Sequence, residues 1–224
     1  MIPALLWTIS ALIGAAFAVR VGIRFWRTRR LHHAAWFVGF ALYTFTALAS
    51  ALAYAVGWNP WMYKLWYVAA AALVAFLGAG ELYFVARPRW AHAFLGAMVL
   101  VALAMLVKAL TVPVDLARLG AGGEIGGEAL PGSVRLFSPL LTIPGSLALI
   151  GGALWSGLRR RSVAGLWVAA GSLIMASGGT LTRFGMAELL PVANSVGVVL
   201  LYAGYVIAGV RQMESGIVSE KTAG

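Results

Sequence analysis

Residues 3–30 read PALLWTISALIGAAFAVRVGIRFWRTRR, an apolar run of about 20 residues that ends in a cluster of arginines. In a helix that rises about 1.5 Å per residue, such a run crosses a hydrocarbon core about 30 Å thick. Six similar runs follow it along the chain. The predicted spans lie at about 3–23, 34–56, 62–86, 90–112, 137–157, 163–184 and 189–210.

The composition excludes a water-soluble domain, because 62% of the residues are hydrophobic, 11% are charged and the mean hydropathy is +0.89. Backbone groups in lipid must bond internally, so the spans are helices or strands of a closed barrel. The apolar runs are continuous and do not alternate, which indicates helices. We expect an all-α membrane protein with one seven-helix domain over 1–211, an extracellular loop over 113–136 and a cytoplasmic polar tail over 212–224.

Most of the 17 lysines and arginines follow the odd-numbered spans: Arg20, Arg24, Arg27, Arg29, Arg30, Arg87, Arg89, Arg159, Arg160, Arg161, Arg211 and Lys221. By the positive-inside rule, the N-terminus lies outside and the C-terminus in the cytoplasm. The net charge of +10 is therefore a topology signal, and nucleic acid is not an expected partner. The first span lacks a basic segment before it, so we interpret it as a retained helix and not as a signal peptide.

Polar groups inside the membrane are the candidates for function, because they are costly in hydrocarbon unless they are paired or face water. Glu81 lies about 27 Å below the outer surface and Arg20 about 25 Å below it, at about 1.5 Å per residue. The matching depths predict that Glu81 pairs with Arg20, or otherwise with Arg24. The pair is either a structural link between the first and third helices or part of a coupling or substrate-binding site, and snorkelling of the Glu81 carboxylate toward the membrane surface is the third alternative.

Further polar residues on the second, sixth and seventh spans are candidates to line a cavity. They are Tyr43, Thr46, Ser50, Tyr54, Ser177, Thr180, Asn194, Tyr202 and Tyr205. The first four share one helix face by their spacing. Packing between helices is the alternative role of such residues, and small-xxx-small spacings such as Ala47/Ala51/Ala55 favour close helix approach.

Several chemistries lack their residues. The chain has no cysteine, and its histidines, His32, His33 and His92, lie at the cytoplasmic boundary. We therefore expect no metal, no haem or other cofactor, and no Ser-His catalysis among the buried serines. The seventh span contains no lysine that could carry a retinal Schiff base. The duplicated Gly-Gly-Glu of the loop at 122–128 is either a flexible tether or a weak cation site.

The stretches 10–16 (SALIGAA) and 147–153 (LALIGGA) suggest an internal repeat, and an arginine cluster follows each of them. The helices that contain them run in the same direction, so the plan is a parallel 3+1+3 repeat. This plan resembles that of sugar-efflux transporters and PQ-loop proteins, although no Pro-Gln pair occurs in the first or fifth span.

A second resemblance rests on GWNPWMYKLWY at 57–67, Ala86-Arg87-Pro88-Arg89 and Thr142-Ile143-Pro144-Gly145. These stretches are similar to uncharacterised seven-span proteins of bacteria, which implies location in the bacterial inner membrane. The resemblance implies no activity.

Three functions stay open. The sequence favours a small-solute transporter or another membrane protein that binds a small molecule. A non-catalytic sensor or accessory subunit, with a protein partner or a second copy, is the alternative. A lipid-modifying enzyme is the third, although the chain shows no catalytic set of residues.

Overall fold

The computed structural model describes residues 2–119, 126–159, 161–184, 186 and 189–222, and omits the side chains of 179–183 and 209–222. Its helices are α1 (Ile2–Thr28), α2 (Leu31–Val56), α3 (Pro60–Val85), α4 (Pro88–Thr111), α5 (Leu116–Leu119), α6 (Gly132–Arg135), α7 (Phe137–Arg159), α8 (Val163–Arg183) and α9 (Leu190–Thr222). The described residues contain no strand, which confirms the all-helical prediction for this part of the chain.

Local sequence explains where helices begin and end. Asn59 caps α3, since its Oδ1 accepts a hydrogen bond from the backbone N–H of Trp61 at 2.9 Å, and Pro60 occupies the first helical position. At the turn after α1, Arg29 takes a left-handed φ of 54°, and Arg161 does the same before α8 with φ 48°. These backbone conformations allow very short turns between successive helices.

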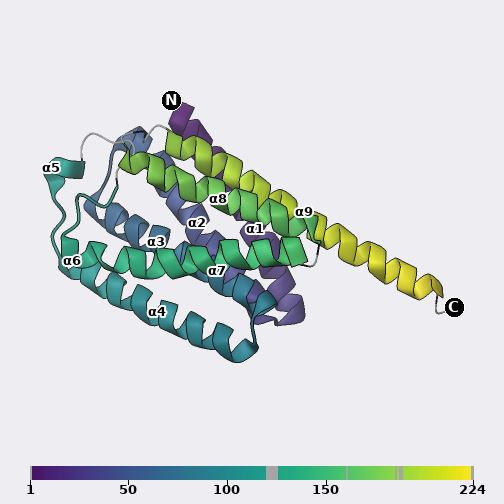
Figure 1. Cartoon of the computed structure of the whole chain (residues 1–224). Coiled ribbons are helices and arrows are strands. Elements are labelled where there is room, and N and C mark those ends of the chain that lie inside the picture. The colour runs from purple at the N-terminus through teal and green to yellow at the C-terminus, as the bar shows by residue number, and fades with distance from the viewer. Residues whose placement is uncertain (1, 120–125, 160, 185, 187–188, 223–224) are drawn as a thin grey trace.

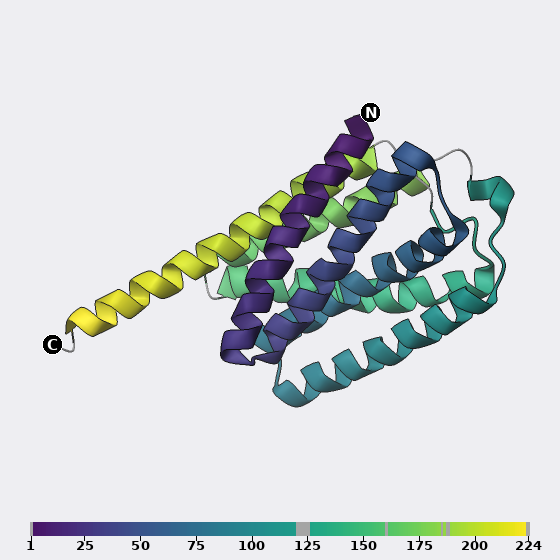
Figure 2. The same ribbon diagram turned by 180° about the vertical axis from the view of Figure 1, so that it is seen from behind.

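Six of the long helices close into a ring. Around it, α1 packs on α2, α2 on α3, α3 on α7, α7 on α8, α8 on α9, and α9 on α1. Helix α4 lies outside this ring against α3 and α7 (Figure 1). Seen from behind, α1 and α2 form the opposite wall, with α8 and α9 beyond them (Figure 2). The first and last helices of the chain are therefore neighbours.

Glycines bring neighbouring helices of the ring into backbone contact. A methyl group on Gly145 of α7 would lie 2.8 Å from the Cα of Ala75 in α3. One on Gly165 of α8 would lie 2.7 Å from the backbone nitrogen of Gly157 in α7, and Gly171 approaches the backbone of α9 equally closely. Small residues at the contact are the usual way for helices to associate in lipid.

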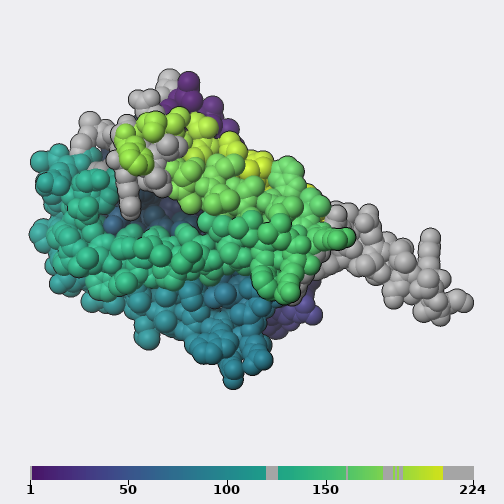
Figure 3. All heavy atoms as spheres, viewed as in Figure 1, coloured from purple at the N-terminus to yellow at the C-terminus, as the bar shows by residue number. Residues whose placement is uncertain are grey.

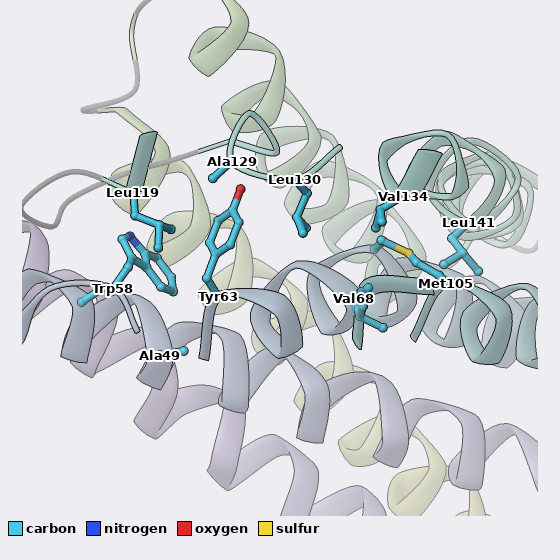
Figure 4. Packing of buried hydrophobic residues seen from close by; sticks show 14 of the residues in the cluster. Ala49, Trp58, Tyr63, Val68, Met105, Leu119, Ala129, Leu130, Val134 and Leu141 are labelled. Atoms are coloured by element: carbon cyan, nitrogen blue, oxygen red, sulfur yellow. The ribbon is translucent and has the colours of Figure 1, made fainter. Parts of the chain in front are cut away.

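The loop between α4 and α7 packs on the end of the bundle. Leu119 and Leu130 of this loop are buried in a cluster with Trp58 and Tyr63 (Figure 4). The Tyr63 hydroxyl donates a hydrogen bond to the carbonyl of Gly126 at 2.6 Å. The described parts of the loop therefore form a packed cap. Residues 122–125, on which most of the predicted tether or weak cation site falls, lie outside the described residues.

The helices suit a membrane. By length and composition, six described helical segments can cross it, and α8 is apolar over the shorter stretch Val163–Gly178. Large apolar side chains such as Leu100, Leu147 and Val107 are 62–70% exposed, as lipid-facing residues must be. The protein is thus a multi-pass integral membrane protein whose helices contact lipid. Its orientation and a count of seven spans remain predictions.

Helix α9 continues beyond its apolar part. Its membrane-spanning stretch is Leu190–Ala208, whereas the helix extends to Thr222 (Figure 1). The predicted polar tail over 212–224 is therefore helical as far as Thr222.

The contact between α3 and α7 gives a first testable prediction. Gly145→Ala places a methyl group against the α3 backbone, so we expect a loss of about 1–3 kcal/mol in the free energy of unfolding. Gly151→Ala, in the same helix, is the matched control because a methyl group there meets no atom within 4 Å. Thermal unfolding of the purified protein in detergent measures both changes. Equal stability of the two variants would contradict this account of the ring.

Candidate binding site inside the helix ring

A cavity of about 260 Å³ lies inside the ring, and all six ring helices contribute to its wall. We call it the outer cavity, because it lies toward the predicted outer side. Each helix is represented in the wall by at least one residue: Trp7 of α1, Tyr43 of α2, Ala70 of α3, Ser146 of α7, Met175 of α8 and Asn194 of α9. Binding pockets for drug-sized ligands have volumes of about 300–1,000 Å³, so this cavity suits a smaller molecule.

The wall of the outer cavity is apolar with a few polar groups and no charged side chain. The Tyr43 hydroxyl donates a hydrogen bond to the backbone carbonyl of Asn194 at 3.3 Å. The amide nitrogen of Asn194 donates to the carbonyl of Leu190 at 2.9 Å, and Thr46 Oγ1 donates to the carbonyl of Tyr43 at 2.8 Å. These three side chains thus bond to the backbone of the wall itself, and Ser146 adds a further hydroxyl group. A charged solute would lose its hydration here without compensation, so the cavity favours a neutral one.

Below the outer cavity the ring is closed by a constriction with only about 10 Å³ of space. Its wall is made of Phe17, Trp36, Phe40, Leu77, Leu149, Val168 and Leu201. The rings of Phe17 and Phe40 stack with their centroids 3.7 Å apart, and Trp36 meets Phe17 edge-on at 6.3 Å. Leu77, Leu149 and Leu201 also line the outer cavity, so the two spaces are contiguous.

A second cavity of about 390 Å³, the inner cavity, lies on the other side of the constriction. It shares Trp36 and Val168 with the constriction. In the order α1, α2, α3, α7, α8 and α9, its wall includes Arg24, His33, Glu81, Ser156, Gly165 and Tyr205. Unlike the outer cavity, it is lined by several charged and polar groups.

The three spaces follow one another along the ring. On α3, the outer cavity is lined from Trp66 to Leu77, the constriction by Leu77, and the inner cavity by Glu81 and Phe84. The interval from Trp66 to Phe84 corresponds to about 27 Å of helix, close to the thickness of the hydrocarbon core, about 30 Å. The spaces thus form an interrupted passage through the middle of the ring.

Figure 3 shows the molecular surface hollowed between α7 and α8, with darker-coloured atoms of the N-terminal helices visible in the hollow. Both helices contribute to the outer cavity, through residues such as Ser146 and Ser172.

The structure distributes the predicted cavity-lining residues among several environments. Tyr43, Thr46 and Asn194 line the outer cavity, and Tyr205 lines the inner one. The remaining residues lie elsewhere: Ser50 accepts a hydrogen bond from the Trp66 indole at 3.1 Å, Tyr54 packs near Trp7, Ser177 is exposed and donates to the carbonyl of Ile174, Tyr202 packs against Phe17, and the side chain of Thr180 lies outside the described residues.

Glu81 is buried on α3, beside α7. Its Oε1 accepts a hydrogen bond from Ser156 Oγ at 3.5 Å, and its side chain packs on Gly152. The Arg20 guanidinium lies over the ring of Tyr202, with its Cζ 5.4 Å from the centroid. Arg24 lines the same cavity as Glu81. The pairing of Glu81 with Arg20 stays a prediction, and the shared cavity favours the alternative, Arg24.

Sequence reasoning missed the constriction. Phe17, Phe40 and Leu149 look like lipid-facing residues, because a bundle core and a membrane are equally apolar. One feature of the sequence could have indicated the constriction. Three aromatic residues on α1 and α2 lie at the same depth in the membrane: Phe17, Trp36 and Phe40.

Fold and cavities together define a polytopic helical membrane protein with a hollow six-helix ring. No family model, no curated protein and no solved structure matches this chain.

The constriction gives a second prediction. Phe17 is 1% exposed, so Phe17→Ala removes a buried ring, and we expect a loss of about 3–5 kcal/mol in the free energy of unfolding. Phe45→Ala is the control, because Phe45 is 38% exposed on the outside of α2. Thermal unfolding in detergent compares the two. Loss of stability in Phe45→Ala to the same extent would show that Phe17 is not a core residue.

Proposed function

We propose that this protein is a transporter of a small neutral solute, which binds in the outer cavity and leaves through the inner one. The observation that carries the proposal is the order of the three spaces along the ring. A packed bundle would need no cavity on either side of an aromatic closure.

Transport requires the constriction to open, and the contacts around the ring differ in how readily they can separate. Helices α3 and α7 meet through backbone atoms at Gly78 and Gly145. Helices α1 and α9 meet through side chains: the Ser10 and Ser195 hydroxyls are 2.8 Å apart, and Arg20 lies over Tyr202. We assign the opening movement to the α1/α9 contact, with the α3/α7 contact as the fixed side.

The arrangement of contacts supports the parallel 3+1+3 plan. In this plan α1, α2 and α3 correspond to α7, α8 and α9. The contact between α3 and α7 then corresponds to the contact between α9 and α1, and the ring contains both contacts. Helix α4 then links the two triplets from outside, as in the sugar-efflux transporters and PQ-loop proteins that this plan resembles. The proposal includes seven spans, an external N-terminus, and location in the bacterial inner membrane.

The nature of the solute follows from the outer cavity. Its wall suits a neutral, mostly apolar molecule with a small polar group, because the wall is mostly apolar and carries no charge. Ser146 and Thr46 are polar residues that such a molecule would meet.

A sensor or accessory subunit is the second candidate. The observation that favours it is the continuation of α9 to Thr222 beyond its membrane-spanning part. A continuous helix is suited to connect the membrane domain with a partner outside it. In that case the cavities would hold a signal molecule without passing it on.

The passage gives a third prediction, which uses the absence of native cysteine. Ser146→Cys in the outer cavity and Ser156→Cys in the inner cavity lie on the same helix and are conservative in size. We expect membrane-impermeant thiol reagents to modify the first from the N-terminal side of the membrane and the second from the opposite side.

Labelling in right-side-out and inverted membrane vesicles measures the sidedness. Labelling of both cavity cysteines from the same side, or of neither, would contradict the passage and favour the sensor or subunit. Leu147→Cys is the control for residues that face lipid, since Leu147 is 70% exposed on the outside of α7.

A further inference from the structure

The inner cavity concentrates positive charge. Arg24 near the end of α1 and Arg30 before α2 line it. The imidazoles of His32 and His33 also line it and are not counted in this charge. Among the described lining residues, Glu81 is the one acidic side chain. Two guanidinium groups against one carboxylate leave the cavity cationic; Arg24 is half-buried, whereas Arg30 is exposed.

Hydrogen-bond donors and helix ends add to this charge. Both α2 and α8 begin at the cavity, which is lined by His32 and His33 in the first turn of α2 and by Ala164 and Gly165 in that of α8. Helix starts present backbone N–H groups and a partial positive charge. Arg30, the N-cap of α2, makes no side-chain capping bond, so its side chain is not needed to begin the helix.

We propose that the inner cavity is a binding site for a phosphate-bearing anion. Guanidinium groups recognise phosphate with paired hydrogen bonds, and helix starts favour the same group. The volume of about 390 Å³ is many times that of one water molecule, about 30 Å³, so it accepts phosphate with an organic group attached. The phosphate belongs either to a soluble phosphate ester or to the headgroup of an anionic lipid at the same membrane face.

The site does not depend on transport. A phosphate group bound at this end of the ring would be held whether the outer cavity passes its solute on or keeps it. Glu81 lies within the same cavity, so its carboxylate opposes the anion. Replacement of Glu81 by glutamine should therefore tighten binding, whereas loss of Arg30 should weaken it.

The fourth prediction tests the site with the purified full-length chain in a neutral detergent. Calorimetric titration with inorganic phosphate and with glycerol 3-phosphate, at constant ionic strength, gives Kd. We expect Arg30→Gln to weaken binding about tenfold or more, because a charge-assisted hydrogen bond is lost. Glu81→Gln is expected to strengthen binding. Arg27→Gln is the matched control, since Arg27 is exposed near the end of α1 and does not line the cavity.

A second arm identifies the source of the phosphate. The same titration is made in nanodiscs of phosphatidylcholine alone and of phosphatidylcholine with phosphatidylglycerol. Loss of phosphate binding in the phosphatidylglycerol discs, and not in the discs of phosphatidylcholine alone, assigns the site to a lipid headgroup. Unchanged binding assigns it to a soluble phosphate ester.

Two results would overturn the proposal. One is the absence of phosphate binding in detergent together with identical thermal stability in the two kinds of nanodisc. The other is equal weakening by Arg27→Gln and Arg30→Gln, which would show diffuse attraction to a basic surface and no site.

Discussion

The structure depends on backbone contact between helices that have no hydrophobic reason to associate. Lipid tails are as apolar as leucine, so helices in a membrane associate through close packing and hydrogen bonds. Gly78 and Gly145 provide this contact between α3 and α7, and Gly157 and Gly165 provide it between α7 and α8. Because α3 meets α7, the N-terminal and C-terminal helix triplets join along one side, and α9 can return to α1 and close the ring.

A closed ring creates an interior that differs from lipid. Six helices around one axis leave space in the middle unless large side chains fill it, and here Phe17, Trp36 and Phe40 fill only one level. Above that level the wall is neutral, and below it the wall carries Arg24, Arg30 and Glu81. This asymmetry connects the two proposals, since a neutral solute and an anion would meet different ends of the same ring.

Much of the fold could be predicted from the sequence, because the length of an apolar run depends on the membrane alone. The seven long helices occupy the predicted spans, although α1 and α9 extend beyond them. The surroundings of individual side chains were harder to predict than the helices. Tyr43, Thr46 and Asn194 were identified as lining residues, yet the same reasoning chose Ser177, which is exposed. The spacing of polar residues shows which of them share a helix face. Which way that face points depends on how the helix packs against its neighbours, at contacts such as Gly145 and Gly171 that the sequence alone does not identify.

The most direct test of the closed ring is a cross-link between its first and last helices. Ser10 Oγ of α1 and Ser195 Oγ of α9 lie 2.8 Å apart, so cysteines at both positions can form a disulfide in this cysteine-free chain. We expect mild oxidation in membranes to produce a disulfide within one chain, detected by mass spectrometry of unreduced peptides, and none between Ser10→Cys and Ser177→Cys. Failure of the first pair to link, or equal linking of both pairs, would contradict the ring.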